Sequence, residues 1–315
     1  MGDYRAAWLG KAGWGVFCHY LAGNPSAPGA PELRVEEWNE RIEAVDVEEL
    51  AAQLGAVGAN YLLFTLGQNS GYYCAPNATY DSIVDINPSK CSQRDLVSDL
   101  GEALSSYGIR LLTYLPSGAP EHDPVAVDRL EWENLRTSGE NKRLATFQTA
   151  WEAVVREWGE RWGDTVAGWW IDGCYFADAM YRHPEPPNFV SFASSLRAGY
   201  PDRIVAFNPG VDLPVTPHTV HEDYTAGELI QALDLGYWAD DGYRPICADF
   251  DGIQYHVTTF LGEQWGRGSP RFGANLVDGY TEYVTGHGGA ITWEVPIRDD
   301  GTIEQEFIEL LAHIN

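Results

Sequence analysis

The chain has 315 residues and a mass of 34.9 kDa, within the usual range for one large α/β domain. Acidic residues outnumber basic ones, 46 Asp and Glu against 20 Lys and Arg, for a formal net charge of −26. Such a charge repels phosphate backbones and anionic lipid, so we exclude nucleic acid and membrane surfaces as partners. Hydrophobic residues make up 44% of the chain, enough to bury a full core.

Tryptophan and tyrosine are abundant, with 12 and 17 residues. The apolar C–H faces of sugar rings stack on aromatic planes, so this composition is compatible with a carbohydrate site, although aromatic residues also build cores. The five cysteines are scattered, with no C-x-x-C pair and no metal-type spacing, which favours free and mostly buried thiols. A disulfide between Cys74 and Cys91 is the open alternative.

The N-terminal residues contain no apolar signal region, and no apolar run is long enough to span a membrane. We therefore expect a cytoplasmic protein, or a secreted one if a leader has been removed. No feature of the sequence assigns an oligomeric state.

Short apolar strands alternate with amphipathic helical stretches along the whole chain. Several of these strands are apolar almost throughout, which is typical of strands covered on both faces. The predicted strands span residues 14–20, 60–66, 110–115, 166–171, 203–208, 219–224, 254–260 and 290–295. The predicted helices span residues 45–54, 94–107, 142–162, 189–198, 273–284 and 303–313, and loops rich in Gly or Pro are expected at 23–31 and 116–120.

This alternation predicts a parallel sheet covered by helices. Eight strand–helix units in about 300 residues fit a closed (β/α)8 TIM barrel. We therefore predict an α/β protein with a single barrel domain over residues 1–315 and no interdomain linker. A doubly wound open sheet is the alternative, but no G-x-G-x-x-G motif follows the first strand.

In this barrel class the active site lies at the C-terminal ends of the strands. Polar and aromatic residues at or just beyond those ends are therefore candidates for contacts with a substrate. They are His19, Tyr20, Gln68, Asn69, Tyr114, Asp172, Asn208, Glu222, Asp223, Glu228, Trp293 and Glu294.

Asp172 is the most informative of these residues. It ends the apolar run 166–171, and Gly173 leaves room beside it. Burying a carboxylate is costly unless it is paired, so an acid at this position indicates function, with a helix cap or a buried ion pair as the alternative.

Cleavage of a glycosidic bond needs two carboxyl groups, one to attack or stabilise the sugar cation and one to protonate the leaving oxygen. Asp172 is the candidate for the first role, and Glu222, Glu228 and Glu294 compete for the second. His19 has no obvious second and third metal ligand, and no G-x-S-x-G motif is present. We expect neither a metal nor a cofactor.

Several segments, collinear over nearly the whole chain, resemble the α-L-fucosidases of glycoside hydrolase family 29. Gly15-Val-Phe-Cys-His-Tyr20 resembles the family's G-[IV]-F-x-H-W strand, and Trp169-Trp-Ile-Asp-Gly173 resembles its nucleophile strand. Asp223-Tyr-Thr-Ala-Gly-Glu228 resembles the segment that carries the acid/base in some members. Further similar stretches are 46–65, 93–97, Trp265-Gly266 and 276–289.

The resemblance implies a retaining mechanism. Asp172 then forms a glycosyl-enzyme, and Glu228 protonates the departing oxygen and afterwards activates water. It also implies that Trp170 and Trp265 bind substrate, that no cofactor takes part, and that the catalytic unit is a TIM barrel. Because the eighth unit ends the chain, we expect no accessory β-sandwich of the kind common in the family.

The chain departs from the family pattern at positions that grip sugar hydroxyls. The family's H-H-D-G after the second strand is here Gln68-Asn-Ser-Gly71, and its Asn-x-Arg after the fifth strand is here Asn208-Pro-Gly210. A site built for particular hydroxyls rejects analogues that leave its polar groups unpaired. We therefore expect an α-L-fucoside-like glycoside or oligosaccharide whose sugar is not fucose.

Two other functions stay open. The missing His pair is compatible with a carbohydrate-binding barrel that has lost hydrolysis, and Glu222 or Glu294 could serve an inverting glycosidase. The separation of the carboxyl groups distinguishes the two hydrolytic mechanisms, because retention needs about 5–5.5 Å and inversion roughly 6.5–9.5 Å.

Overall fold

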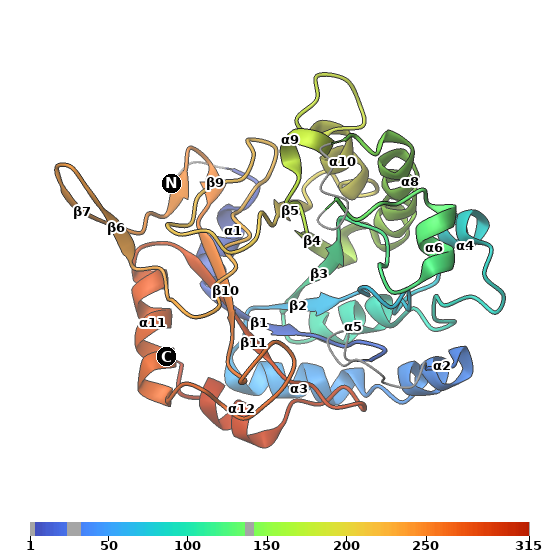
Figure 1. The fold of residues 1–315 in the computed structure, drawn as a ribbon. Helices are drawn as coiled ribbons and strands as arrows, with labels where there is room; N and C mark the ends of the chain where they lie inside the picture. The colour runs from blue at the N-terminus through green and yellow to red at the C-terminus, as the bar shows by residue number, and fades with distance from the viewer. Residues whose placement is uncertain (1–3, 24–32, 136–141, 315) are drawn as a thin grey trace.

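The computed structural model describes residues 4–23, 33–135 and 142–314, so the loop expected at 23–31 lies outside the described residues except for Gly23. Seven parallel strands form one curled sheet in the order β10-β11-β1-β2-β3-β4-β5 (Figure 1). These strands are β1 (Trp14–Cys18), β2 (Tyr61–Thr65), β3 (Arg110–Pro116), β4 (Val166–Asp172), β5 (Ile204–Phe207), β10 (His256–Phe260) and β11 (Ala290–Val295).

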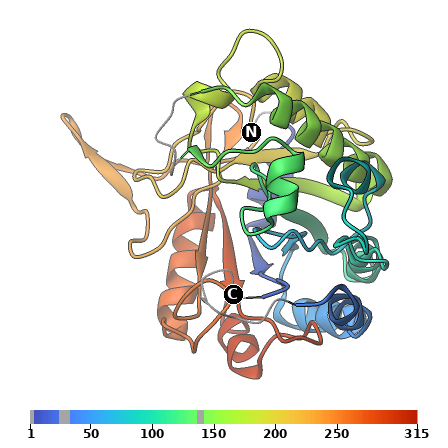
Figure 2. The same cartoon turned by 45° about the vertical axis from the view of Figure 1, so that its right-hand side comes forward.

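Helices surround the convex side of this sheet (Figures 1 and 2). The six predicted ones are present as α3 (Val47–Val57), α5 (Leu96–Ser105), α8 (Ala145–Trp162), α10 (Phe189–Leu196), α11 (Ala274–Gly286) and α12 (Gln305–Leu311). The sequence patterns do not predict five further short helices and a turn of 3-10 helix: α1 (Ala7–Ala12), α2 (Val35–Glu43), α4 (Ala78–Val84), α6 (Pro124–Arg129), α9 (Ala177–Met180) and η1 (Gly163–Thr165).

The helix boundaries follow from local chemistry. The side chain of Asp46 accepts the N–H of Glu49 and caps α3, which ends at Gly58 in the left-handed conformation. Asp95 caps α5 in the same way through the N–H of Ser98. These capped helices bury their apolar faces against the outer face of the sheet, which fixes the position of each strand end.

The sixth predicted strand, residues 219–224, is not a strand, and the predicted closed eight-stranded barrel is not formed. The N–H groups of Val205 and Phe207 on β5 donate to the carboxylates of Asp223 (2.9 Å) and Glu222 (3.2 Å). Side-chain oxygens thus take the place of the carbonyl groups that a neighbouring strand would present. The segment 223–229 still connects β5 to β10 through backbone hydrogen bonds and two isolated parallel bridges, Tyr224–Gln254 and Glu228–Thr258. The fold is therefore an α/β barrel-like half-barrel with no regular strand between β5 and β10.

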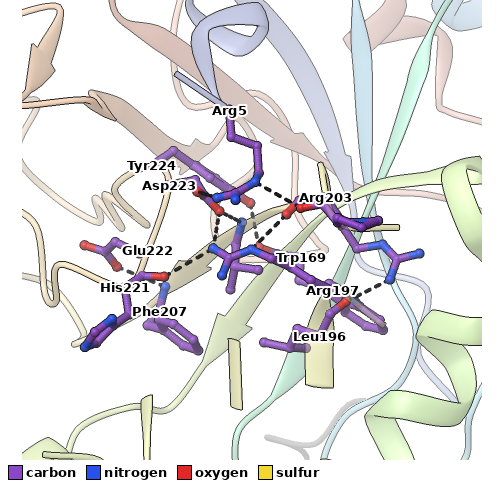
Figure 3. A network of polar contacts seen from close by, with 12 residues as sticks. Arg5, Trp169, Leu196, Arg197, Arg203, Phe207, His221, Glu222, Asp223 and Tyr224 are labelled. Carbon is purple, nitrogen blue, oxygen red and sulfur yellow. Dashed lines mark hydrogen bonds and ion pairs between the residues drawn. The ribbon is translucent and has the colours of Figure 1, made fainter. Parts of the chain in front are cut away.

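Asp223 is held in this gap by two arginines (Figure 3). Arg5 contacts its Oδ1 at 2.5 Å, and Arg197 contacts its Oδ2 at 2.6 Å. Two ion pairs and a hydrogen bond from a backbone N–H offset the free-energy cost of burying this carboxylate. The sequence predicts that Asp223 contacts a substrate at the strand ends. In the structure Asp223 instead binds Arg5, Arg197 and the backbone of β5, and so fixes the segment that follows β5.

Arg203 ties the outer helices to the sheet next to the gap, and its side chain is completely buried (Figure 3). Its guanidinium donates to carbonyl oxygens at the end of α8, the start of β4 and the end of α10, which are those of Gly159, Gly163, Val166, Leu196 and Ala198. Burial lowers the pKa of Arg203 to about 10, so the side chain stays charged at neutral pH.

Two hydrophobic cores lie on opposite faces of the sheet. The larger core fills the space between the sheet and the helices and includes Trp169 and Trp293. The smaller core fills the inside of the curl and includes Phe17, Tyr114 and Trp170. Because side chains alternate between the faces of a strand, every second residue of β4 reaches the concave side, where the candidate site lies.

Helix α1 closes one end of the concave core, to which it contributes Leu9 and its N-cap residue Ala6. A hairpin of β6 (Gly236–Ala239) and β7 (Gly242–Pro245) projects from the body (Figures 1 and 2). A second small hairpin, β8 (Asp249–Phe250) and β9 (Ile253–Gln254), precedes β10. The predicted strand 254–260 is thus divided between β9 and β10.

Candidate active site

A cavity of 520 Å³ opens at the C-terminal ends of the parallel strands. Eight of the residues predicted from strand ends or from the family resemblance line it: His19, Tyr20, Gln68, Tyr114, Trp170, Asp172, Glu228 and Trp265. They come from six different strands or the loops that follow them. The structure therefore brings together side chains that are far apart in the sequence.

Asp172 is the last residue of β4 and lies on the same face of the strand as Trp170. Four donors contact its carboxylate, the most distant being the Tyr175 hydroxyl at 3.4 Å from Oδ1. The hydroxyl of Tyr114 donates to Oδ2 (2.6 Å), and the N–H of Gly173 donates to Oδ1 (2.7 Å). Gln68 in turn donates to the Tyr114 hydroxyl (2.7 Å), which leaves that hydroxyl's proton for Asp172.

Another donor is the side-chain amide of Asn208, just beyond β5. Its nitrogen donates to Oδ1 of Asp172 (2.9 Å) and also to Oε2 of Glu228 (2.8 Å). The amide oxygen accepts the N–H of Gly210 (3.0 Å), and this bond fixes the orientation of the amide group. One completely buried side chain thus connects the two candidate carboxylates.

Glu228 reaches the cavity because Gly227 lies directly against β10. The N–H of Thr258 donates to the Gly227 carbonyl (2.9 Å). Gly227 has a φ of +60°, and a Cβ at this position would lie 2.0 Å from the carbonyl oxygen of His256. Only glycine permits this approach, so the sequence Gly227-Glu228 itself sets the position of the glutamate.

Six aromatic rings line the cavity, those of Phe17, His19, Tyr20, Tyr114, Trp170 and Trp265. The ring centroid of Phe17 lies 4.1 Å from that of His19, and Trp265 packs edge-on against His19 at 5.6 Å. Tyr114 stacks on Trp170 at 5.5 Å. An apolar wall facing carboxylates is the arrangement that binds a sugar, because sugars carry both C–H faces and hydroxyl groups.

His19 pairs with Glu294, the penultimate residue of β11. Its Nδ1 lies 3.2 Å from Glu294 Oε1, and the N–H of Gly266 donates to the same oxygen (2.7 Å). Glu294 is completely buried, and burial raises the pKa of its carboxyl while the hydrogen bond from His19 lowers it. Glu294 therefore lies behind the cavity wall and not in the cavity.

Trp293 was predicted to bind substrate, and the structure contradicts this. Its ring is completely buried in the outer core, and its Nε1 donates to Thr281 on α11 (2.8 Å). Neighbouring residues of a strand point to opposite faces, so Trp293 and Glu294 could not both face the site.

Glu222, a candidate acid, also lies away from the cavity. Its carboxylate accepts the N–H groups of Phe207, His218 and Thr219, and burial raises its pKa to about 8. Asn69 is not among the cavity-lining residues either. Strand-end position alone does not distinguish a carboxylate that faces the cavity from one that holds the backbone.

The sequence interpretation missed nine residues of the cavity. They are Phe17, Leu21, Gly23, Arg41, Gln264, Gly266, Arg267, Ile297 and Asp299. The position of Phe17 was predictable, because it is two residues before His19 on the same strand face. The others belong to loops or to a helix whose positions carry no periodic signal.

Among the described residues, no group of three or more His, Cys, Asp or Glu side chains is arranged to hold a metal ion. The described part of the chain also contains no helix that is both long and apolar enough to cross a bilayer. All five cysteines are free thiols, including Cys74 and Cys91.

No protein-family model and no curated protein sequence matches the chain. Among solved structures it is similar to two endo-fucoidan hydrolases of glycoside hydrolase family 107. MfFcnA4 has a TM-score of 0.72 at 17% identity over 98% of this chain, and MfFcnA9 has 0.72 at 18% over 98%. The chain spans 53% and 63% of the length of these two proteins.

The chain is also similar to α-L-fucosidases. AlfC from Lactobacillus casei, in complex with α-L-fucose, has a TM-score of 0.63 at 14% identity and is covered over 96% of its length. Isoenzyme 1 from Paenibacillus thiaminolyticus has 0.64 at 15% identity and is covered over 73%. Both similarities cover 98% of this chain. The distant resemblance to α-L-fucosidases indicated by the sequence motifs is thus confirmed at the level of the fold.

Proposed function

We propose that the protein is a retaining glycoside hydrolase in which Asp172 is the nucleophile and Glu228 is the acid/base. The observation that carries this proposal is the shared amide of Asn208, which donates to both carboxylates at the edge of an aromatic cavity. The similarity in fold to fucosidases and endo-fucoidan hydrolases supports the same class of reaction.

The geometry supports retention over inversion. Oδ1 of Asp172 and Oε2 of Glu228 are both hydrogen-bonded to one nitrogen, so they are less than about 6 Å apart. A retaining pair of carboxyl groups needs about 5–5.5 Å, and an inverting pair needs roughly 6.5–9.5 Å to admit water. The alternative inverting acids, Glu222 and Glu294, lie outside the cavity.

The mechanism then has two steps. Asp172 attacks the anomeric carbon while Glu228 gives its proton to the departing oxygen, and a glycosyl-enzyme forms. Glu228, now a carboxylate, removes a proton from water, which attacks the same carbon and releases Asp172. The donors on Asp172 from Tyr114, Gly173 and Asn208 keep the carboxylate oriented for attack.

We propose an α-L-fucoside-like glycoside as substrate, with a sugar other than fucose. Gln68 uses one of its two amide N–H groups on Tyr114, so one N–H donor and the carbonyl oxygen are left for a sugar. The amide presents these groups from one planar end on a flexible side chain, in contrast to the rigid imidazole that the fucosidase motif places there. This difference supports a changed pattern of hydroxyl recognition.

A panel of 4-nitrophenyl glycosides tests the proposal. It contains α-L-fucopyranoside, α-L-galactopyranoside, β-D-arabinopyranoside and unrelated sugars. We expect the wild type to cleave an L-fucose-like sugar of the panel faster than α-L-fucopyranoside itself, and Asp172→Asn to lower this turnover on the order of a thousandfold or more. Glu222→Gln, which changes a carboxylate outside the cavity, is the control.

Thermal unfolding of each variant separates loss of chemistry from loss of fold. Turnover that is unchanged in a folded Asp172→Asn variant contradicts the proposal. Binding of these sugars by calorimetry without any release of nitrophenol from wild-type protein favours a carbohydrate-binding barrel instead.

A further inference from the structure

Glu294 is a buried carboxyl group that the proposed mechanism does not use. It lies at the end of β11 and is completely inaccessible to solvent. One of its oxygens, Oε1, is hydrogen-bonded to both His19 and Gly266, and its Oε2 has no partner in the described part of the chain. Burying a carboxyl group with one unpaired oxygen costs free energy, so we expect this glutamate to have a function that offsets the cost.

The bonds at Oε1 determine where the proton of His19 lies. A backbone N–H can only donate, so the 2.7 Å contact from Gly266 makes Oε1 an acceptor. We assign Nδ1 of His19 as the donor of the second contact, at 3.2 Å, because a hydrogen bond from His19 favours the ionised Glu294 and lowers the pKa of its carboxyl. A neutral imidazole with its proton on Nδ1 carries an acceptor lone pair on Nε2.

The ring of His19 is also fixed by its neighbours. It lies 4.1 Å from Phe17 and 5.6 Å from both Tyr114 and Trp265, measured between ring centroids. Because the ring lines the cavity and Nδ1 is engaged with Glu294, Nε2 is the nitrogen left for a ligand. No hydrogen bond to Nε2 comes from any described residue.

Other ionisable groups near the pair do not replace His19 as a partner of Glu294. Arg271 acts on Glu294 through its charge, but its guanidinium donates to Phe260, Ile230 and Thr259. The Cys18 thiol is completely buried beside Glu294, and burial raises its pKa, so this thiol stays neutral.

We propose that Glu294 is a positioning residue that holds the His19 proton on Nδ1, so that Nε2 presents a hydrogen-bond acceptor to a substrate hydroxyl. The hydroxyl-binding part rests on the proposed glycosidase function, whereas the position of the proton does not. His19 then contacts the hydroxyl from the cavity wall, and Glu294 fixes the His19 tautomer from behind that wall.

The first experiment is multiple-bond ¹H–¹⁵N NMR on the protein without ligand, at a pH where histidines are neutral. The His19 signals are assigned by their loss in His19→Ala. We expect the pattern of the Nδ1–H tautomer in wild type and in Glu294→Gln, because the amide oxygen of glutamine still accepts from Gly266 and His19. In Glu294→Ala the pattern should change to the Nε2–H tautomer that free histidine favours.

The second experiment measures kcat and KM with the 4-nitrophenyl glycoside that wild type cleaves fastest. Glu294→Ala should raise KM about ten- to a hundredfold, the effect of a lost hydrogen bond to a polar substrate group. The double variant His19→Ala/Glu294→Ala should be no worse than His19→Ala alone, because the two residues act as a unit. Glu222→Gln is the control, as a buried strand-end carboxyl group outside the cavity.

An Nε2–H tautomer in wild type, or a tautomer unchanged in Glu294→Ala, overturns the proposal. Additive effects of the two alanine substitutions on KM also overturn it, because they show that Glu294 acts without His19. If the tautomer changes as expected but no glycoside is cleaved by wild type, the proposed hydrolase function fails while the role of Glu294 toward His19 stands.

Discussion

At the residue scale, one amide connects the two candidate catalytic carboxylates. Asn208 is completely buried and donates to Asp172 and Glu228 at 2.9 and 2.8 Å. Asn208→Ala removes both bonds and leaves two acidic groups near each other without a shared donor. We expect kcat/KM to fall about tenfold to a hundredfold, from the loss of a hydrogen bond to a charged group.

Asn208→Gln is the matched control, because it keeps the amide but displaces it by one methylene. Steady-state kinetics of both variants, with circular dichroism to verify the fold, test this prediction. Wild-type kinetics in a folded Asn208→Ala protein contradict the role assigned to the amide.

Glu222 predicts a pH dependence of stability. Its pKa is about 8 in the folded protein, against 4.5 as the ordinary value, and burial is the largest cause. Between these pH values the folded state holds a proton that the unfolded state has lost, so the unfolding free energy falls as pH rises from 4.5 to 8. Glu222→Gln cannot ionise and lacks this contribution.

Urea unfolding of wild type and Glu222→Gln at pH 5, 6.5 and 8 measures the effect. The stability of wild type relative to the variant should decrease over this range by an amount on the order of a few kcal/mol. A difference that stays constant with pH contradicts the raised pKa.

Two features of strand geometry explain which site residues the sequence predicts: the position of a residue at a strand end, and the face of the strand on which it lies. Asp172 ends an apolar strand, and its carboxyl group can be identified because an acid directly after an apolar run is costly unless it is paired or functional. The prediction for Trp293 is wrong because strand-end position does not distinguish the two faces of a strand, and alternation turns Glu294 rather than Trp293 toward the concave side. Asn208 lies at a strand end, but its bridge between two carboxylates depends on a three-dimensional contact that no spacing encodes.

At the element scale, the segment after β5 depends on a single glycine. Gly227 has a φ of +60°, and a Cβ there would lie 2.0 Å from the His256 carbonyl oxygen. Gly227→Ala should therefore displace Glu228 from the cavity and destabilise the fold by more than the roughly 1 kcal/mol of an unfavourable φ alone. Turnover should fall with it.

Gly58→Ala is the matched control for this prediction. Gly58 has a φ of +78° at the end of α3, and nothing lies within 4 Å of the position of its Cβ. Unfolding midpoints of the two variants separate conformational strain from steric conflict. Equal destabilisation by the two substitutions, with turnover retained in Gly227→Ala, disproves the assigned role of the close approach.

The elements that the sequence predicted are those with strong periodicity. Six of the predicted strands and all six predicted helices lie near their observed positions. A further predicted strand, 254–260, is divided between β9 and β10. The strand expected at 219–224 is absent because Asp223 and Glu222 accept the N–H groups of β5 through their side chains. Hydrophobic patterning cannot reveal that competition, and it also misses helices of one or two turns such as α6.

At the scale of the whole molecule, the net charge of −26 predicts a salt effect on stability. Like charges on one surface repel and destabilise the compact state, and salt screens them, with a Debye length of about 10 Å at 0.1 M. The melting temperature should therefore rise by a few degrees between 20 mM and 0.5 M NaCl at pH 7.5. Near pH 4.5, the isoelectric point, the increase should vanish. Scanning calorimetry measures both, and a melting temperature that falls with salt at pH 7.5 contradicts the prediction.

The central claim is that Asp172 attacks the sugar, and the most direct measurement is the trapping of the glycosyl-enzyme. A 2-deoxy-2-fluoro glycosyl fluoride of the sugar that wild type cleaves slows release of the intermediate, because fluorine destabilises the cation-like transition state. Mass spectrometry of the intact protein and of its peptides then locates the sugar. We predict one added sugar per chain, on the peptide that contains Asp172, and none in Asp172→Asn. A sugar attached to another carboxylate, or cleavage with no adduct and an inverted product, contradicts the account.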